Sequence, residues 1–247
     1  MKASEPPRWL LIGNSRWHWA WPDPGPGAVR VEHHPLGAHQ PEAGALLAWA
    51  ATGAVPEGVL PHARRLGPAA VPLRDLPPWL GIDRALAGWL AWRLAAGPVL
   101  VADAGTVLSL TWVDGAGVFR GGRLMAGVAL QLRAMAAGTR ALPALADPRE
   151  AIGPDPEGSW PRGTEAAMAI GVLQGLSAAV VEAWRDLRRR EGPCALIVTG
   201  GDGPALIERI GHASPPAATA ALEPDLALRA LAELRPCPQA RPRSVRI

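Results

Sequence analysis

The sequence predicts an α/β protein built as two related halves, and three observations point to this fold class. Its 247 residues are 49% hydrophobic and 19% charged, enough apolar material for one large domain or two smaller ones with real cores. A buried strand followed by a glycine turn occurs twice, with Gly13 and Gly105 separated by 92 residues. Each half then continues through further strands into a helical pattern.

The first half opens on an apolar strand that breaks at a glycine and two small polar residues. Its predicted elements are, in order, strand 9–12, a turn at 13–15, strand 16–21, a turn at 22–25, strand 29–33 and helix 82–94. Side chains alternate along a strand, so Trp17, Trp19 and Trp21 share one face of the second strand.

The second half repeats this opening. Its predicted elements are strand 99–103, a turn at 104–106, strand 107–113, a hairpin turn at Asp114-Gly115 leading into 118–119, helix 164–190 and strand 195–198. The densest run of arginines occupies the end of that helix before Gly192, where the helix dipole favours cations. The run and the formal net charge of +3 therefore do not predict nucleic-acid binding.

The composition excludes several kinds of chemistry. Lys2 is the only lysine and there is no tyrosine, which excludes a P-loop lysine, a Schiff-base lysine and a tyrosine acid. Cys194 and Cys237 form neither a zinc site by themselves nor a disulfide framework, and free thiols fit a reducing compartment. The histidines show no metal-ligand spacing, since the adjacent His33 and His34 point to opposite faces of a strand.

No membrane-spanning segment or signal peptide is expected. The longest stretch without a charge, 166–181, has 16 residues, fewer than the roughly 18 to 20 apolar residues of a membrane-spanning helix. Glu5 and a Pro6-Pro7 pair precede the first short apolar run, so the core of a signal peptide is missing. We therefore expect a soluble, cytoplasmic protein with no membrane partner.

Two glycine turns at the mouths of related sheets have a physical use in binding phosphates. Their backbone N–H groups and hydroxyls can hold one polyphosphate from both sides, because glycine lets the backbone approach closely. The repetition of the turn predicts a nucleotide cleft between the two halves.

Several short motifs occur in a specific order between about Trp9 and about Leu234. They are Gly13-Asn14-Ser15, Gly81-Ile82-Asp83-Arg84, Asp103-Ala104-Gly105-Thr106, Gly121 to Gly127, Gly138 to Pro143, Thr164 to Met168 and Thr199-Gly200-Gly201-Asp202. In this order and spacing they resemble type III pantothenate kinase, a family of the sugar kinase, Hsp70 and actin superfamily. The resemblance implies duplicated ribonuclease H-like domains, as in actin-like ATPases, over 8–96 and 97–234. The tail at 235–247, with three prolines and four arginines, is expected to be flexible.

The resemblance also implies an activity and a set of contacts. The family transfers the γ-phosphoryl group of ATP to the primary hydroxyl of pantothenate, the first step towards coenzyme A. The matching ATP contacts are Leu11, Ile12, Gly13, Asn14, Ser15, Arg16, Trp17, His18 and Thr106. The matching pantothenate contacts are Gly81, Ile82, Asp83, Arg84 and Thr164, the last of them near the partner subunit of a homodimer.

Asp83 is the candidate general base. Phosphorylation of an alcohol requires its proton to leave as the phosphoryl group arrives, and a carboxylate within hydrogen-bond reach can accept that proton. In the family the matching aspartate is the proton acceptor. The alternative is an ordinary helix N-terminus, where Asp83 favours the dipole and Arg84 faces solvent.

Three further positions carry both a family role and a plainer alternative. The family aspartate matching Asp103 binds a monovalent cation, K⁺ or NH₄⁺, while Mg²⁺ arrives with ATP; the alternative is a strand-ending Asp in a turn. Thr164 is also a candidate N-cap of the long helix. The adenosine motif, Thr199–Gly203, is also compatible with an ordinary strand–turn–helix junction.

The chain departs from the family pattern at Leu11, where the first phosphate motif normally has an aspartate, and at Ala126, where the family prefers proline. Leucine cannot bind a cation, so either the nucleotide, waters and Asp103 hold Mg²⁺ or the site is weak. Two alternative functions stay open. One is a kinase for another small alcohol. The other is a non-catalytic regulator like the family's Bvg accessory factor, which Leu11 favours and the retained Asp83 and Asp103 oppose.

Overall fold

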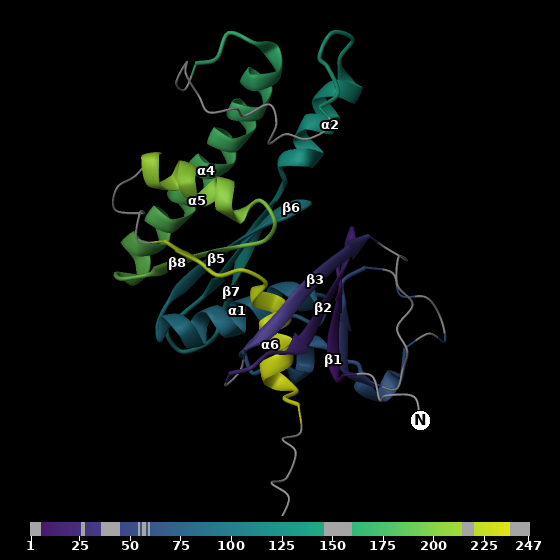
Figure 1. Cartoon of the computed structure of the whole chain (residues 1–247). Coiled ribbons are helices and arrows are strands. Elements are labelled where there is room, and N and C mark those ends of the chain that lie inside the picture. Colours follow the sequence, from purple (N-terminus) through teal and green to yellow (C-terminus); the bar gives the residue numbers. More distant parts are fainter. Residues whose placement is uncertain are drawn as a thin grey trace, which may run out of the picture. The chain divides into compact units, whose positions relative to one another are not determined.

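The computed structural model describes residues 6–25, 28–35, 45–53, 55, 58, 60–145, 160–213 and 220–237. Internal contacts divide the chain into two units, each with its own sheet (Figure 1). Unit 1 comprises Met1–Val71, Gly81–Leu86 and Ala227–Ile247, and unit 2 comprises Pro72–Leu80 and Ala87–Leu226. The domain boundaries expected from the sequence stay a prediction, and 238–247 of the expected tail lie outside the described residues.

Unit 1 contains a four-stranded sheet with the order β3-β2-β1-β4. Its strands are β1 (Arg8–Ile12), β2 (Arg16–Pro22), β3 (Val29–Pro35) and β4 (Leu46–Ala51). β1 pairs antiparallel with β2 and parallel with β4, and β2 pairs antiparallel with β3. The three predicted strands are confirmed, whereas β4 is an element that the sequence analysis did not identify.

The tryptophans that alternate along β2 share one face, as predicted, and this face covers the core of unit 1. Trp17 and Trp19 are 3% and 1% exposed, and they contact Leu10, Ile12 and Trp49. The ring centroids of Trp17 and Trp19 lie 6.4 Å apart in an edge-to-face arrangement, which adds to the stabilisation from burial. The residues that alternate with these tryptophans therefore face the other side of the sheet.

Unit 2 contains a five-stranded sheet with the order β7-β6-β5-β8-β9. Its strands are β5 (Val99–Ala104), β6 (Val107–Val113), β7 (Phe119–Ala126), β8 (Ala195–Thr199) and β9 (Ala221–Leu222). β5 pairs antiparallel with β6 and parallel with β8, and β6 pairs antiparallel with β7. The strands and turns predicted for the second half are thus confirmed.

The two sheets repeat one topology, which confirms the predicted duplication. In each sheet three consecutive strands form an antiparallel meander, and a later strand pairs parallel with the first of them. That later strand is β4 in unit 1 and β8 in unit 2.

The helices connect and cover these strands. They are α1 (Ile82–Ala95), α2 (Val128–Gly138), α4 (Thr164–Glu191), α5 (Gly203–Ala213) and α6 (Leu226–Leu234), with short 3₁₀ turns at His62–Arg64 and Pro68–Ala70. Helix α1 begins with residues of unit 1 and continues with residues of unit 2. The helix predicted at 82–94 thus differs from α1 by one residue, at its C-terminal end.

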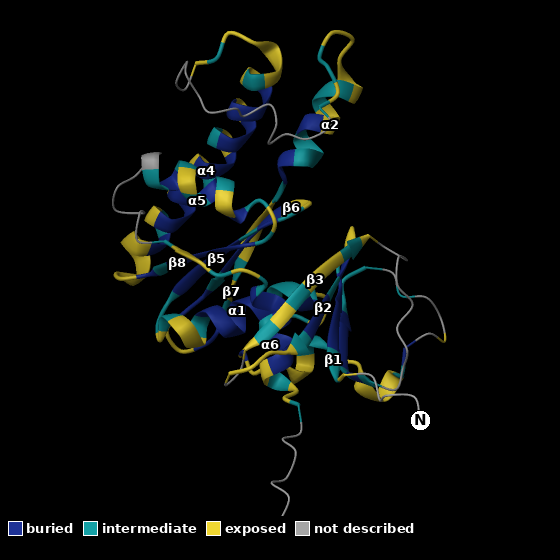
Figure 2. Ribbon diagram, viewed as in Figure 1, coloured by how far each residue is buried: buried dark blue, intermediate teal, exposed yellow. Residues whose placement is uncertain are grey.

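Helix α4 is the main helix of the unit 2 core. It packs against α2, α5 and β5, and its buried residues form a stripe along its length (Figure 2). By length and composition α4 could span a membrane, but 56% of its most apolar window is buried inside the fold. Such burial is typical of a core helix. The helix ends at Gly192, which has a φ of 78° and donates its N–H to the Arg188 carbonyl over 3.1 Å.

Candidate active site

The turn between β1 and β2 is the candidate phosphate turn of unit 1. The Gly13 N–H donates to the Arg16 carbonyl over 2.9 Å, which closes a tight turn with Asn14 and Ser15 exposed at its tip. A Cβ atom at Gly13 would lie 3.2 Å from the Arg16 carbonyl oxygen, so the turn has little room for a side chain there. The turn therefore presents backbone and small polar groups to the surface, as phosphate binding requires.

Leu11 lies two residues before this turn and is only 7% exposed. Its side chain offers no oxygen ligand, and Mg²⁺ requires oxygen ligands. Nowhere in the described parts of the chain do three or more His, Cys, Asp or Glu side chains form a group that could hold a metal ion. The turn of unit 1 thus does not fit an Mg²⁺ ion held by the protein at this position.

A second segment, Thr52-Gly53, lies directly against the phosphate turn and was missed by the sequence analysis. Thr52 donates to the Ile12 carbonyl twice, from its backbone N–H over 2.9 Å and from its hydroxyl over 3.2 Å. A Cβ atom at Gly53 would lie 2.6 Å from the Gly13 carbonyl oxygen, a separation that real Cβ atoms do not show. Position 53 therefore requires glycine for as long as the turn keeps its shape.

The predicted pantothenate motif forms the first turn of α1 and reaches the same segment. The Ala85 N–H donates to the Gly81 carbonyl over 3.1 Å, and the Arg84 N–H donates to Asp83 Oδ1 over 2.8 Å. A Cβ atom at Gly81 would lie 2.6 Å from Asp83 Oδ1 and 3.6 Å from the Thr52 methyl carbon. Thr52 thus lies between the phosphate turn and the candidate base within unit 1.

The environment of Asp83 suits a general base. Burial raises the pKa of its carboxyl above the usual 3.8, and the hydrogen bond from the Arg84 backbone opposes this only in part. Asp83 also lies in the first helical turn, where the plainer alternative placed it. Arg84, however, is half-buried and does not face solvent freely, and burial lowers its pKa.

In unit 2, three backbone segments meet at the end of β5. The Gly127 N–H donates to the Thr106 carbonyl over 3.0 Å, and the Asp202 N–H donates to the Ala104 carbonyl over 2.9 Å. A Cβ atom at Gly127 would overlap the Gly105 carbonyl oxygen. A cavity of about 10 Å³ lies between these segments, large enough for no more than about one water molecule. Phosphate groups would therefore bind outside the packed turns, where Thr106 is exposed.

The Asp103 carboxylate lies at this junction, near the end of β5. Gly200 has a φ of +89°, and a Cβ atom there would lie 2.6 Å from Asp103 Oδ1 and overlap the Ala104 carbonyl oxygen. One carboxylate beside main-chain carbonyls is an oxygen-rich environment. Such a donor set fits a monovalent cation such as K⁺ or NH₄⁺, with its remaining ligands supplied by water or phosphate. The predicted strand–turn–helix junction at Thr199–Gly203 is also confirmed.

The predicted N-cap role of Thr164 is wrong. The N-cap of α4 is Gly163, which makes no side-chain cap, and Thr164 is the first helical residue. A threonine in the first helical position has no N-cap geometry, because its own backbone is already helical. Thr164 is exposed, which leaves its family role as a substrate contact open.

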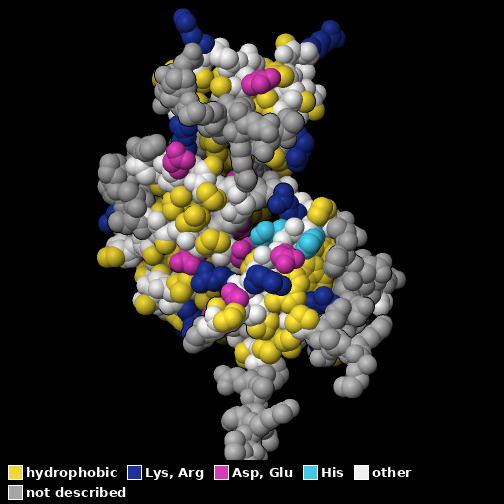
Figure 3. Space-filling model, in the orientation of Figure 1, with side chains coloured by type: hydrophobic (Ala, Val, Ile, Leu, Met, Phe, Trp, Pro, Cys, Tyr) yellow, Lys and Arg dark blue, Asp and Glu magenta, His cyan; other side chains and the backbone are white. Residues whose placement is uncertain are grey.

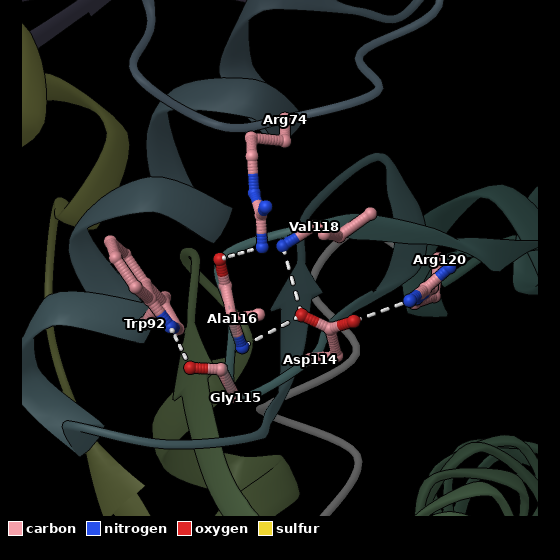
Figure 4. Close-up of polar contacts among 7 residues, drawn as sticks. All are labelled: Arg74, Trp92, Asp114, Gly115, Ala116, Val118 and Arg120. Atoms are coloured by element: carbon pink, nitrogen blue, oxygen red, sulfur yellow. Dashed lines mark hydrogen bonds and ion pairs between the residues drawn. The ribbon is translucent and has the colours of Figure 1, made fainter.

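The predicted hairpin turn after β6 is organised by Asp114 (Figure 4). Its carboxylate accepts hydrogen bonds from the Ala116 and Val118 N–H groups over 2.9 and 3.0 Å and from Arg120 Nε over 2.7 Å. Burial raises the pKa of Asp114, but these hydrogen bonds, with that from Val118 the largest, lower it more, so the net shift is downward. The hairpin is therefore held in one shape by a charged acceptor.

The same hairpin holds the segment that leads to the pantothenate motif. The Arg74 N–H donates to the Gly117 carbonyl over 2.9 Å, and the Phe119 N–H donates to the Arg74 carbonyl over 3.0 Å. The Arg74 guanidinium also donates to the Ala116 carbonyl over 2.7 Å (Figure 4). Within unit 2 the chain is thus fixed seven residues before Gly81.

Two histidines that the sequence analysis did not connect, His18 and His33, form a hydrogen-bonded pair. His18 Nδ1 and His33 Nδ1 lie 2.8 Å apart, and the two rings meet edge to face with centroids 4.9 Å apart. His18 is directly opposite His33 in the β2–β3 register. The sequence analysis missed this pair because it placed the turn at 22–25, which would set residue 29 opposite His18. In the structure Pro22 pairs with Val29, and this register brings His33 opposite His18.

Comparison with solved structures gives the class of protein. A Campylobacter jejuni protein described as a Baf family transcriptional activator matches 92% of this chain and 96% of its own length, with 17% identity and a TM-score of 0.59. A second match is the activator of the 2-hydroxyisocaproyl-CoA dehydratase from Clostridium difficile, with bound ADPNP. The match covers 93% of each chain, with 10% identity and a TM-score of 0.50. At these identities the likeness concerns the fold. The fold is that of the actin-like ATPases, as predicted.

Comparison of sequences gives the family. The model of the type III pantothenate kinase family matches residues 71–186. A type III pantothenate kinase of Synechococcus sp. (strain JA-3-3Ab) is 40% identical over 247 aligned residues, which cover 94% of both chains. This chain belongs to the type III pantothenate kinase family, which confirms the resemblance seen in the motifs.

Proposed function

We propose that this chain phosphorylates pantothenate with ATP and that Asp83 is its general base. The observation that carries the proposal is the placement of Asp83, a partly buried carboxylate with a raised pKa, separated from the Gly13 turn by Thr52. Membership of the family supplies the substrates, ATP and pantothenate. The product is 4'-phosphopantothenate, the first intermediate towards coenzyme A.

The transfer needs one proton acceptor and one phosphate-binding turn in unit 1. Asp83 accepts the proton of the pantothenate hydroxyl while the oxygen of that hydroxyl forms a bond to the γ-phosphorus. The bond between the γ-phosphorus and the β–γ bridging oxygen breaks, and ADP leaves with those electrons. The Gly13 N–H closes the turn, and the backbone N–H groups of Asn14 and Ser15 bind the nucleotide phosphates and keep the transferred group in position.

Residues of unit 2 are assigned to the cation and to ATP on the strength of the family pattern. Asp103 would hold K⁺ or NH₄⁺ with its carboxylate, and Thr106 would contact ATP with its exposed hydroxyl. A bound cation offsets negative charge on the nucleotide. Mg²⁺ would arrive with ATP, because the position of Leu11 offers it no ligand.

The remaining assignments concern partners. Gly81, Ile82 and Arg84 would line the pantothenate site with Asp83, and the exposed Thr164 would add a contact at the interface of a homodimer. ATP and pantothenate are small cytoplasmic metabolites, so the proposal includes a cytoplasmic location without membrane or nucleic-acid partners. Burial of the apolar helix α4 within unit 2 agrees with this location.

The test is ADP release by the full chain mixed with ATP, Mg²⁺ and pantothenate, in K⁺ and in Na⁺ buffer. Asp83→Asn is the critical variant, and Asp23→Asn is the matched control, since Asp23 is an exposed carboxylate of the same unit. We expect pantothenate-dependent ADP release that is greater in K⁺, is lost in Asp83→Asn and is kept in Asp23→Asn. Equal rates in Asp83→Asn and the unmodified chain would reject Asp83 as the base.

Two other results would redirect the proposal. ADP release that depends on a different small alcohol would indicate the alternative kinase. No ADP release from folded protein with any alcohol would favour the non-catalytic regulator, for which the apolar Leu11 is the supporting observation.

A further inference from the structure

Leu11, His18 and His33 form a row across three strands of unit 1. In the register of the sheet Leu11 is opposite His18, and His18 is opposite His33. Directly opposed residues project from the same face of a sheet, and this face is the one that the core tryptophans do not occupy. The row therefore begins at the position where the family carries an aspartate and continues through two imidazole rings.

In the hydrogen bond between His18 and His33, one ring is the donor and the other is the acceptor. Only one hydrogen fits between two Nδ1 atoms 2.8 Å apart, so one ring donates and the other accepts. Burial, with smaller contributions from His33 and Arg16, lowers the pKa of His18 to about 4. His18 is therefore neutral at neutral pH and carries one ring hydrogen, on Nδ1 or on Nε2. We assign it the tautomer with that hydrogen on Nε2, in which His18 is the acceptor and the exposed His33 the donor.

This assignment fixes the hydrogen of His18 on Nε2, and Nε2 faces the phosphate turn. A Cβ atom at Gly13 would lie only 3.3 Å from His18 Nε2. A neutral imidazole that accepts at Nδ1 is a hydrogen-bond donor at Nε2. Arg16 lies two residues away along β2, on the same face of the strand, so a cation accompanies this donor. Histidine side chains gather at one place on the face of the molecule shown in Figure 3.

We propose that His18, oriented by His33, donates a hydrogen bond from Nε2 to a phosphate group of the nucleotide bound at the Gly13 turn. In this chain a direct imidazole donor thereby takes the place of the carboxylate-held cation that Leu11 cannot provide. The proposal rests on the proposed function in one respect, since a nucleotide is taken as the natural ligand. The hydrogen bond itself does not require a nucleoside, because any polyphosphate offers the same acceptor oxygens.

The choice of ligand follows from the donor set. The described turn offers the neutral donor His18, the exposed hydroxyl of Ser15, the amide of Asn14 and the cation Arg16, and it offers no carboxylate. Such groups attract an anion and provide no site for a free divalent cation. A polyphosphate is favoured over a single carboxylate because the turn also presents backbone N–H groups.

The test is calorimetric titration of the full chain with ATP, AMP and inorganic tripolyphosphate, each with and without Mg²⁺. His18→Leu removes the donor and keeps a side chain of similar size, while His18→Gln keeps an amide N–H near the place of Nε2. His33→Leu removes the orienting ring. The matched control is His34→Ala, since His34 follows His33 on β3 and instead pairs with Glu32 at 3.4 Å.

We expect His18→Leu to weaken ATP and tripolyphosphate binding about tenfold and to leave AMP binding nearly unchanged, as for loss of one hydrogen bond to a charged group. His18→Gln recovers most of the affinity, His33→Leu is intermediate, and His34→Ala binds like the unmodified chain. Circular dichroism establishes that each variant is folded. Unchanged ATP affinity in His18→Leu, or an equal loss for AMP, would overturn the proposal.

The same titrations separate this proposal from the proposed function. Tripolyphosphate and ATP binding that depends on His18, in a protein without ADP release, would keep the role of His18 and reject the kinase. Pantothenate-dependent ADP release, with nucleotide affinity unchanged in His18→Leu and His18→Gln, would keep the kinase and reject the role of His18. Absence of binding by the unmodified chain to ATP and to tripolyphosphate would reject both.

Discussion

The glycine turns of the two units share their backbone plan and differ in the side chains around it. In unit 1 the Ile12 carbonyl accepts the N–H of Thr52, from the loop after the parallel strand β4. In unit 2 the Ala104 carbonyl accepts the N–H of Asp202, from the loop after the parallel strand β8. In both turns a glycine of that later loop lies too close to a carbonyl oxygen to tolerate a Cβ atom. The backbone arrangement is therefore duplicated along with the sheets.

The side chains at equivalent positions carry opposite chemistry. Two residues before its glycine, unit 2 has Asp103 opposite Ser109, whereas unit 1 has Leu11 opposite His18. The first pair offers oxygen atoms, which suit a cation, and the second offers a nitrogen donor, which suits an anion. The repeated backbone thus carries different chemistry in each unit, and the following variants test that difference.

The largest effect is expected at Asp83, which makes unit 1 the site of the acceptor chemistry. Asp83→Asn keeps the shape of the side chain and removes its ability to accept a proton. We expect kcat for pantothenate phosphorylation to fall about 1,000-fold, within the usual range for a lost general base. Steady-state kinetics would show this loss in kcat with little change in the KM of ATP. A rise in the KM of pantothenate with unchanged kcat would show that Asp83 contributes only to substrate binding.

The pH dependence follows from the raised pKa of Asp83 in the folded chain. Between the ordinary value of 3.8 and the raised value, the folded state holds a proton that the unfolded state has released. The unfolding free energy therefore falls as pH rises through this interval and stays lower above it. Urea unfolding should show Asp83→Asn gaining stability over the unmodified chain as pH rises, with the difference at its smallest below pH 3.8. An opposite trend would contradict the burial of this carboxyl.

The next largest effect is expected from the carboxylate of unit 2. Asp103→Asn keeps the side-chain volume and removes the charge that would hold K⁺ or NH₄⁺. We expect activity in K⁺ to fall about 100-fold, to the level seen in Na⁺, as for other changes at a metal ligand or its support. The measurement is ADP release as K⁺ is titrated. A K⁺ response of unchanged size in Asp103→Asn would place the cation elsewhere.

The glycines beside the two turns test whether the shared backbone is equally tight. Gly200→Ala adds a Cβ atom against the Ala104 carbonyl at a φ of +89°, so we expect a loss of about 3 kcal/mol in unfolding free energy. Gly53→Ala meets only the Gly13 carbonyl, and no positive φ adds to the strain, so we expect about 1 to 2 kcal/mol.

Urea unfolding measures both losses, and Gly201→Ala is the control. A Cβ atom at Gly201 meets nothing within 4 Å, so that variant should stay within about 0.5 kcal/mol of the unmodified chain. Equal losses for Gly53→Ala and Gly201→Ala would show that the turn of unit 1 yields easily, and the two turns would then differ in rigidity as well as in chemistry.

The strands and turns of both units could be predicted because their signals are local. Alternating tryptophans, glycine turns and the Asp114-Gly115 pair each act within a few residues. The strand β4 and the Thr52-Gly53 contact could not, since both depend on parallel pairing with a strand about 40 residues earlier. Parallel pairing carries no turn signal that fixes its register.

For the candidate site, the sequence analysis named motif residues but not the residues that join them. Asp83 and Gly13 were identified, but not Thr52, which lies between them and has no distinctive sequence around it. His18 was identified only as part of an ATP-binding run, because its chemistry comes from a partner across the sheet. The expected N-cap at Thr164 failed because the helix begins one residue earlier than a side-chain cap would require.

The smallest effect is expected from restoring the missing carboxylate in unit 1. Leu11→Asp places a carboxylate opposite His18, where it can hold Mg²⁺ beside a nucleotide phosphate. We expect Mg²⁺ to increase ATP affinity a few-fold more in this variant than in the unmodified chain, with a modest loss of stability because position 11 is 7% exposed. Leu11→Asn is the matched control, since it is polar and of the same size but carries no charge.

The Mg²⁺ effect is the ratio of ATP dissociation constants measured without and with the ion. If that ratio rises in Leu11→Asp and not in Leu11→Asn, the two turns differ because one kept a cation ligand and the other lost it. A ratio that stays the same in Leu11→Asp would mean that the surroundings of position 11, and above all the donor at His18, have already adapted to an anion without a protein-held cation. The His18→Leu, Leu11→Asp double variant separates these readings, because removing the donor should then restore the response to Mg²⁺.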